Sequence, residues 1–92
     1  MSAGTRREAM SRELMELALW LSEHPEMARK HLKPVRRKAS LDPGVYYNRG
    51  TRMIERLYSP QHAALGNQMF HVNSDPAAPV EEIRRRVLEG KS

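Results

Sequence analysis

The placement of proline constrains the fold of this 92-residue chain more than any other feature of its sequence. Pro25, Pro43, Pro60 and Pro79 each stand where an apolar segment begins. Proline is favoured in the first turn of a helix, where its missing N–H has no partner, and it is disfavoured further along. The prolines therefore predict an all-α fold, a compact bundle of four to five short helices in one domain over 1–92.

The first predicted helix runs from Thr5 to about Glu23. Met10, Leu14, Leu17 and Leu21 follow one another at steps of four, three and four. At 3.6 residues per turn, this spacing places them in one narrow apolar stripe that can face a core.

Two further sides of this helix are also apolar. Met15 and Leu19 form a second line, and Trp20 lies on a third side. A helix with so many apolar sides needs several neighbours, so it is either central to the fold or buried in an oligomer. We expect a homodimer or larger oligomer with this helix in the shared core. The residues expected at the oligomer interface are Leu14, Leu17, Trp20 and Leu21.

The second predicted helix spans 25–39, because Ala28, Leu32, Val35 and Ala39 share a stripe. Its periodicity continues through a proline, Pro34. A proline inside a helix removes a hydrogen bond and usually bends the helix. The expectation is a kinked helix, or two short helices that meet at Lys33.

A third helix is expected from Pro43 to about Tyr58, since Asp42 can cap it and its apolar residues have helical spacing. The alternative is a loop over 48–51, with a helix that starts only at Thr51.

The rest of the chain divides into three parts. A short helix is predicted from Ser59 to about Gly66, and a final helix from Pro79 to Glu89, ended by Gly90. The stretch 67–72 reads equally well as a short strand or as an extended connector. With no other strand expected in the chain, a strand there would have to pair across subunits.

The positive charge is concentrated in the middle of the sequence. Residues 1–26 hold three basic and five acidic residues, a net charge of −2, and 55–92 hold five of each. Residues 27–54 hold eight basic residues and one acid, a net charge of +7. Such a localised charge favours an anionic partner more strongly than a high net charge alone does.

The densest basic run is 29–38, which has six cations and no acid. On one helix face these cations would contact the phosphates of a nucleic acid or a nucleotide, with Tyr46, Tyr47 and His31 available to stack on bases. The residues expected to bind the anion or the partner are Arg29, Lys30, Lys33, Arg36, Arg37, Tyr47 and Arg52.

Two other interpretations of this run are open. The cations can simply form a solvated helix face that offsets the acids of the first helix. Alternatively, the chain is a small inhibitor or adaptor, of the anti-defence or immunity type found in phages and mobile elements, which docks on an acidic protein surface. A helix-turn-helix across 39–44 fits poorly, because the charge lies on its first helix and not on the recognition helix.

Catalysis and metal binding have little support in the sequence. The chain has no cysteine, and its four histidines form no pair at helical spacing. The serines stand in helix caps and tails, the acids cluster on solvent faces beside basic residues, and the glycines are isolated. We therefore expect no enzyme activity, no cofactor and no metal. No stretch has the roughly 18 apolar residues of a spanning helix, so the expected location is cytoplasmic, without membrane contact.

Overall fold

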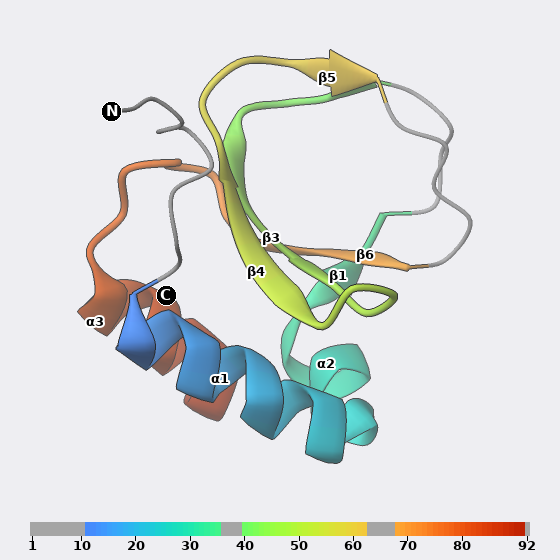
Figure 1. Ribbon diagram of the computed structural model, residues 1–92, viewed down its shortest axis with the longest axis vertical. Helices are drawn as coiled ribbons and strands as arrows, with labels where there is room; N and C mark the ends of the chain where they lie inside the picture. Colours follow the sequence, from blue (N-terminus) through green and yellow to red (C-terminus); the bar gives the residue numbers. More distant parts are fainter. Residues whose placement is uncertain (1–10, 36–39, 63–67, 92) are drawn as a thin grey trace.

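The computed structural model describes residues 11–35, 40–62 and 68–91, and it shows a mixed α/β fold (Figure 1). The all-α prediction is wrong, because the middle of the chain forms a four-stranded antiparallel sheet. The elements in chain order are α1 (Arg12–Glu23), α2 (Pro25–His31), β1 (Lys33–Pro34), β2 (Ser40–Leu41), β3 (Gly44–Asn48), β4 (Met53–Leu57), β5 (Gln61–His62), β6 (Met69–Asn73) and α3 (Val80–Glu89).

The last helix confirms the sequence prediction, and the first confirms it from Arg12 to Glu23. The start of the first helix was predicted too early, because Ser11 is extended and caps α1, and 5–10 lie outside the described residues. At the start of α1, the Ser11 hydroxyl accepts a hydrogen bond from the Leu14 amide at 3.2 Å. Such a cap satisfies one of the amides that a helix start leaves without a partner. At the end of α3, Gly90 adopts a left-handed conformation with φ 73°, which glycine tolerates better than other residues.

The second helix is much shorter than predicted. It ends at His31, and Leu32 is already extended, with φ −119° and ψ 161°. Pro34 lies in β1, which pairs with β6. The residue before a proline avoids the helical region, and the strand pairing supplies hydrogen bonds that a kinked helix would lose. The stripe expected to reach Ala39 is therefore interrupted, and 36–39 lie outside the described residues.

The helix predicted over 43–58 is wrong, and so is the alternative that began at Thr51. The segment forms the hairpin β3–β4, in which Tyr47 pairs with Ile54 and Tyr46 with Glu55. The loop expected at 48–51 does mark the turn between the strands. Valine and two tyrosines in succession favour a strand over a helix.

The strand over 69–73 settles the ambiguity at 67–72, but its pairing corrects the prediction. β6 lies between β1 and β3 in the order β1-β6-β3-β4, so its partners are in the same chain and not in another subunit. The short helix expected over 59–66 is also wrong where it is described. Gln61–His62 form β5, which pairs with β2, and 63–66 lie outside the described residues.

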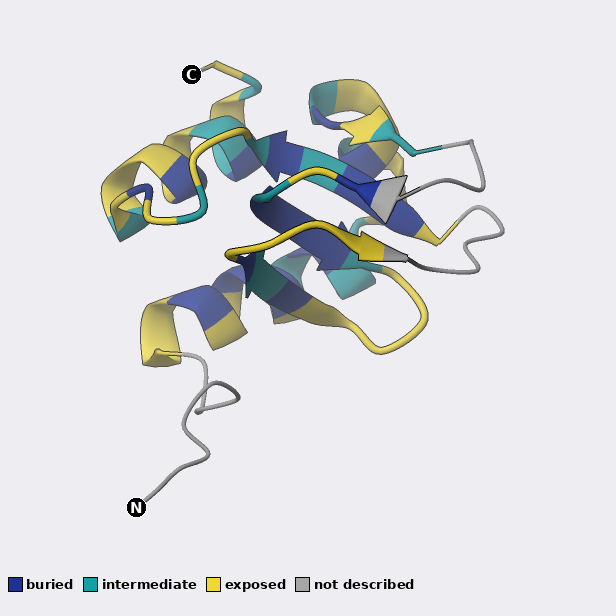
Figure 2. Ribbon diagram, turned by 90° about the horizontal axis from the view of Figure 1, so that it is seen from above, coloured by how far each residue is buried: buried dark blue, intermediate teal, exposed yellow. Residues whose placement is uncertain are grey.

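The helices cover one face of the sheet and form the main core with it (Figures 1 and 2). Alternate residues of the strands point towards the helices, among them Tyr47, Ile54 and Phe70. The helices and the segments beside them contribute Leu14, Leu17, Ala18, Leu21, Ala28, Leu32, Ala78, Ile83 and Val87. Burial of these apolar side chains is the main force that holds the two layers together.

The opposite face of the sheet carries a smaller apolar cluster. The β3–β4 hairpin extends into β2 and β5 and bends over this face, as Figure 1 shows at the top of the molecule. Leu41, Tyr46, Leu57 and Met69 are buried there, and Val35 packs against them. The sheet is therefore buried on both faces around β3, but far more deeply on the helix side.

Candidate binding surface

The structure divides the described part of the predicted basic helix face between two elements, α2 and β1. Arg29 and Lys30 lie on the last turn of α2, and Lys33 lies in β1. All three side chains are exposed. Cations on the last turn of a helix stabilise its negative end, which is a structural role that needs no ligand. Arg36 and Arg37, the other two predicted cations of this run, lie outside the described residues.

The turn between β3 and β4 carries Arg49 and Arg52, both exposed. The Asn48 side chain holds the turn by accepting hydrogen bonds from the amides of Gly50 and Thr51, at 2.8 and 3.1 Å. Arg52 has φ 62° and donates its amide to the Asn48 carbonyl at 2.7 Å. The turn is thus fixed by its own hydrogen bonds, and both guanidinium groups are presented to solvent.

Strand register brings this turn and the basic run to the same end of the sheet. Asn48 pairs with Met69 on one side of β6, and the Val35 amide donates to the Met69 carbonyl at 2.8 Å on the other side. The Arg49 amide also donates to the Gln68 carbonyl, at 2.7 Å. The end of β1 and the β3–β4 turn, which are distant in sequence, therefore lie on the two sides of one end of β6.

We call this surface the basic end; its cations in β1 and the turn are Lys33, Arg49 and Arg52, and Arg29 and Lys30 lie on α2, which precedes β1 on the helix side of the sheet. In Figure 1, α2 and the β3–β4 turn both lie towards the right of the view, with α2 in the helix layer below the sheet. Neighbouring strands are spaced by about 4.8 Å, so the surface spans on the order of 15 Å from β1 to the turn. Among the described residues, no carboxylate pairs with these five cations.

Arg49 is a functional candidate that the sequence reasoning missed. It follows Asn48 in an Asn-Arg-Gly-Thr turn, and that turn was the available signal. The charges of Arg52 and Arg49 also act on the buried Tyr47 hydroxyl. Burial raises the pKa of Tyr47, and the two nearby guanidinium groups lower it in part.

Tyr47 is not on the surface, contrary to its predicted role in binding. It is only 1% exposed, and its ring lies 6.2 Å from the ring of Phe70 in the main core. Tyr46 is buried on the other face, where its hydroxyl donates to the Asp42 carbonyl at 2.8 Å. His31 donates Nδ1–H to the Val87 carbonyl at 2.9 Å. Neither tyrosine ring is therefore available to stack on a base.

Most of the residues predicted for an oligomer interface are buried in the core of the single chain. Leu14, Leu17 and Leu21 are buried in the main core. Trp20 is half-buried, and its ring stacks on that of His24, with the ring centroids 4.8 Å apart. These leucines face the sheet rather than a second subunit, because β3, β4 and β6 supply the neighbours that an isolated bundle helix would lack.

One serine and one histidine lie close enough to raise the question of catalysis. Ser74 Oγ is 3.4 Å from His71 Nε2, just after β6. A nucleophile and its base normally lie within about 2.6–3.2 Å, with a third group that orients the base. Ser74 is three residues from His71 and exposed, which is typical of a local contact at the end of a strand. We assign it no catalytic role.

The described residues were also compared with what a metal site or a membrane-spanning helix requires. In residues 11–35, 40–62 and 68–91, no three histidine or carboxylate side chains are grouped so that they could hold a metal ion. Over the same ranges, the helices are too short and too polar to span a bilayer.

Comparison with models of protein families, with curated proteins and with solved structures finds no match to this chain. The basic end is therefore the strongest basis for a functional argument.

Proposed function

We propose that this chain is a non-enzymatic binding protein that contacts the phosphate backbone of a nucleic acid through the basic end. The observation that carries the proposal is that β1 and the β3–β4 turn, with their exposed cations Lys33, Arg49 and Arg52, lie on the two sides of β6 near Met69. Exposed cations with no paired carboxylate among the described residues release bound counterions from a polyanion at little cost. The cations are spread over a surface and not along one helix face.

The absence of an exposed aromatic ring among the basic-end residues favours backbone contacts over base contacts. Single-strand binding proteins usually stack bases on aromatic side chains, and sequence-specific proteins place a helix or ribbon in a groove. Tyr58 is 66% exposed, but it follows the far end of β4, away from the turn. We therefore expect binding to a duplex with little preference for sequence.

Titration of a labelled duplex of random sequence tests this proposal. We expect binding at about 50 mM salt that weakens by roughly a thousandfold at 200 mM, as five to seven phosphate contacts require. Unlabelled duplexes of different sequence should compete equally well. If the mobility and the anisotropy of the duplex are unchanged at the lower salt concentration, the proposal fails.

A pair of matched double variants then locates the surface. Lys33→Glu with Arg49→Glu reverses two charges of the basic end, and Arg84→Glu with Arg85→Glu reverses two exposed charges of α3. The first pair should reduce the slope of log affinity against log salt by about two, while the second leaves it nearly unchanged. Equal effects of the two pairs would show that net charge alone drives binding.

Two further measurements separate this proposal from its alternative. Reversal of Arg36 and Arg37 to glutamate should abolish duplex binding, because these residues belong to the densest basic run of the sequence, 29–38. A protein partner that stays bound at high salt after nuclease treatment would instead favour an inhibitor or adaptor that docks on an acidic protein surface.

A further inference from the structure

A small cluster of polar groups surrounds His71 on the face of the sheet opposite the helices. His71 pairs with Lys33 of β1 on one side and with Tyr46 of β3 on the other. Residues directly opposite each other in antiparallel strands point to the same face, with their Cβ atoms about 5 Å apart. The Tyr46 ring meets the imidazole edge-on, with the ring centroids 5.4 Å apart. The imidazole therefore lies between a tyrosine ring and an exposed lysine side chain.

Ser74 adds a hydroxyl to this cluster. Its Oγ lies 3.4 Å from Nε2 of His71, which is longer than a strong hydrogen bond, so both atoms can bind a further group. The turn that contains Ser74 is held by its neighbours, because the Asn73 and Asp75 side chains accept hydrogen bonds from the amides of Asp75 and Ala77, at 2.8 and 2.9 Å. Ser74 is exposed, so a ligand can reach its hydroxyl from solvent.

The charge around His71 is predominantly positive. Burial lowers the pKa of His71, and the nearby charges of Arg86 and Lys33 lower it further. Among the described residues, Asp42 is the acid that acts in the opposite direction. The Arg86 guanidinium donates through Nη1 to the Gly90 carbonyl at 3.3 Å, but its buried Nε has no hydrogen-bond partner among the described residues. Two cations and one carboxylate thus act on the imidazole, an excess of positive charge that favours a bound anion.

We infer that Lys33, His71 and Ser74 form a binding site for one phosphate group, which the nearby charge of Arg86 also attracts. The lysine ammonium, the protonated imidazole and the serine hydroxyl can each donate to a different phosphate oxygen, and the charged donors form the stronger hydrogen bonds. The group can be free phosphate or the terminal phosphate of a nucleotide, because both present the same oxygens. Binding of one phosphate group here does not require the proposed duplex binding, since the site does not include the β3–β4 turn.

Phosphate binding at this site should take up a proton. The lowered pKa of His71 leaves the imidazole mostly neutral at pH 7, whereas a bound phosphate dianion favours the protonated form. The ratio of the parent's affinity to that of His71→Gln should therefore rise as the pH falls from about 8 to about 6, and this ratio cancels the titration of phosphate itself. The groups that face the imidazole are Lys33 from β1, Tyr46 from β3, Arg86 from α3, Asp42 from the segment before β3, and Ser74.

Titration of the whole chain with inorganic phosphate tests the site, with chloride at equal ionic strength as the reference. In the nuclear magnetic resonance spectrum, the imidazole signals of His71 should shift saturably with phosphate, and the pKa of His71 should rise when the site is filled. The affinity measured by calorimetry should fall about tenfold for His71→Gln, which removes a charge-assisted hydrogen bond, and about threefold for Ser74→Ala. His24→Gln, a change at another half-buried histidine whose Nδ1 lies 2.9 Å from the Trp20 carbonyl, should leave the affinity unchanged.

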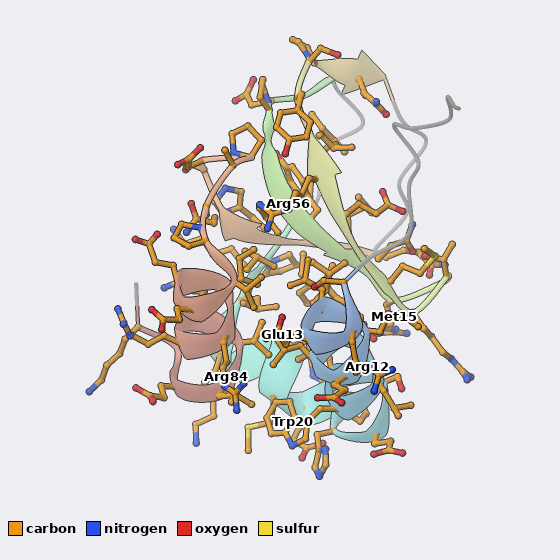
Figure 3. All side chains as sticks on the ribbon, turned by 60° about the vertical axis from the view of Figure 1, so that its left-hand side comes forward. Arg12, Glu13, Met15, Trp20, Arg56 and Arg84 are labelled. Atoms are coloured by element: carbon orange, nitrogen blue, oxygen red, sulfur yellow. The ribbon has the colours of Figure 1, made fainter. Side chains whose placement is uncertain are left out.

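A matched pair on α3 tests the contribution of Arg86. Arg84 and Arg86 are two positions apart and therefore about 200° apart around the helix. Figure 3 shows Arg84 on the side of α3 that faces α1. Arg86→Met should raise the pKa of His71, because it removes a nearby positive charge, whereas Arg84→Met should leave that pKa unchanged. Both variants should keep the circular dichroism spectrum of the parent. If the two variants affect His71 equally, the charge of Arg86 does not reach the site.

Two ligands distinguish the sources of the phosphate group. If a nucleoside 5′-monophosphate binds at least as tightly as inorganic phosphate, the ligand is a terminal phosphate; if it binds more weakly, the ligand is free phosphate, and both results support the site. Arg49→Glu should weaken duplex binding and leave phosphate binding unchanged, which separates this site from the basic end. The inference is overturned if phosphate produces no saturable shift at His71, or if His71→Gln and His24→Gln bind phosphate equally well.

Discussion

The two faces of the sheet differ in what they bury and in how they are stabilised. The helix-side face packs Tyr47, Ile54 and Phe70 against three helices, while the opposite face has a four-residue cluster beneath the bent ribbon of β2 and β5. The second face also carries Lys33 and the half-buried His71 beside the small cluster. The difference indicates that the helix-side face provides most of the folding stability. The opposite face contributes less, and it can therefore accommodate charged residues such as Lys33.

We expect the largest difference between the faces in the free energy of unfolding lost by two truncations on β4. Ile54→Ala removes a side chain that is 2% exposed in the main core, and Leu57→Ala removes one that is 7% exposed in the small cluster. We expect losses of about 3–4 kcal/mol and about 2 kcal/mol in the free energy of unfolding, because the small cluster can relax more easily around a cavity. Urea denaturation measures both losses. Equal losses would contradict the comparison.

Two glycines of the β3–β4 hairpin give the next largest difference. A Cβ on Gly44 would lie 2.6 Å from the backbone oxygen of Asn73, which cannot move without displacing β6. A Cβ on Gly50 would meet the Gln68 side-chain oxygen at the same distance, and that side chain can rotate away. Gly44→Ala should therefore cost about 1–3 kcal/mol and Gly50→Ala much less, as thermal unfolding would show. A larger loss for Gly50→Ala than for Gly44→Ala would indicate that β3 and β6 can move apart to accommodate the new methyl group.

Two adjacent tyrosines provide a smaller and more specific test. The Tyr46 hydroxyl donates to the Asp42 carbonyl, whereas the Tyr47 hydroxyl is buried with no hydrogen-bond partner among the described residues. Tyr46→Phe should lower the free energy of unfolding by about 1 kcal/mol, and Tyr47→Phe should leave it unchanged or raise it. A loss for Tyr47→Phe as large as that for Tyr46→Phe would mean that its hydroxyl has a partner in solution.

The smallest expected effect is a pH dependence of stability from the second face. Burial lowers the pKa of His71 below its ordinary value of 6.5, and the charges of Arg86 and Lys33 lower it further, while Asp42 acts in the opposite direction. The unfolded chain therefore binds a proton more readily than the folded chain does. The stability from neutral His71 is complete above pH 6.5 and is lost as the pH falls through the lowered pKa.

Comparison with His71→Gln isolates this contribution. The difference in the free energy of unfolding between parent and variant should shrink as the pH falls from 7 to 5, on a scale set by the ordinary histidine pKa of about 6.5. A difference that is constant with pH would show that His71 does not titrate differently in the folded chain.

The sequence predicted the elements whose signals are local. α1 has an apolar stripe with a 3.6-residue period, and α3 combines Pro79 at its start with Gly90 at its end. Such features depend on residues within a few positions of each other. The asymmetric charge was also readable from the sequence alone, and it led to Arg29, Lys30 and Lys33 as surface residues.

The strands β3 and β4 were missed, in β3 because burial on both faces removes the alternation that identifies a strand. Gly44, Val45, Tyr46 and Tyr47 are all buried, so β3 shows a continuous apolar run. In β4, the apolar residues Met53, Ile54 and Leu57 fit a helical spacing as well as a strand. The basic end could not be predicted either, because it depends on the pairing of Asn48 with Met69, which are distant in sequence.

The position of β6 has a consequence for how the chain folds. Among the described strands it is the last in the sequence, yet it lies inside the sheet and holds β1 to β3. During synthesis, the β3–β4 hairpin can form on its own, but α1 and α2 have no completed sheet to cover until residue 73 has emerged. Contacts between such distant segments slow folding. A fragment ending at residue 62 should therefore show no cooperative unfolding, and the whole molecule should fold as one late event.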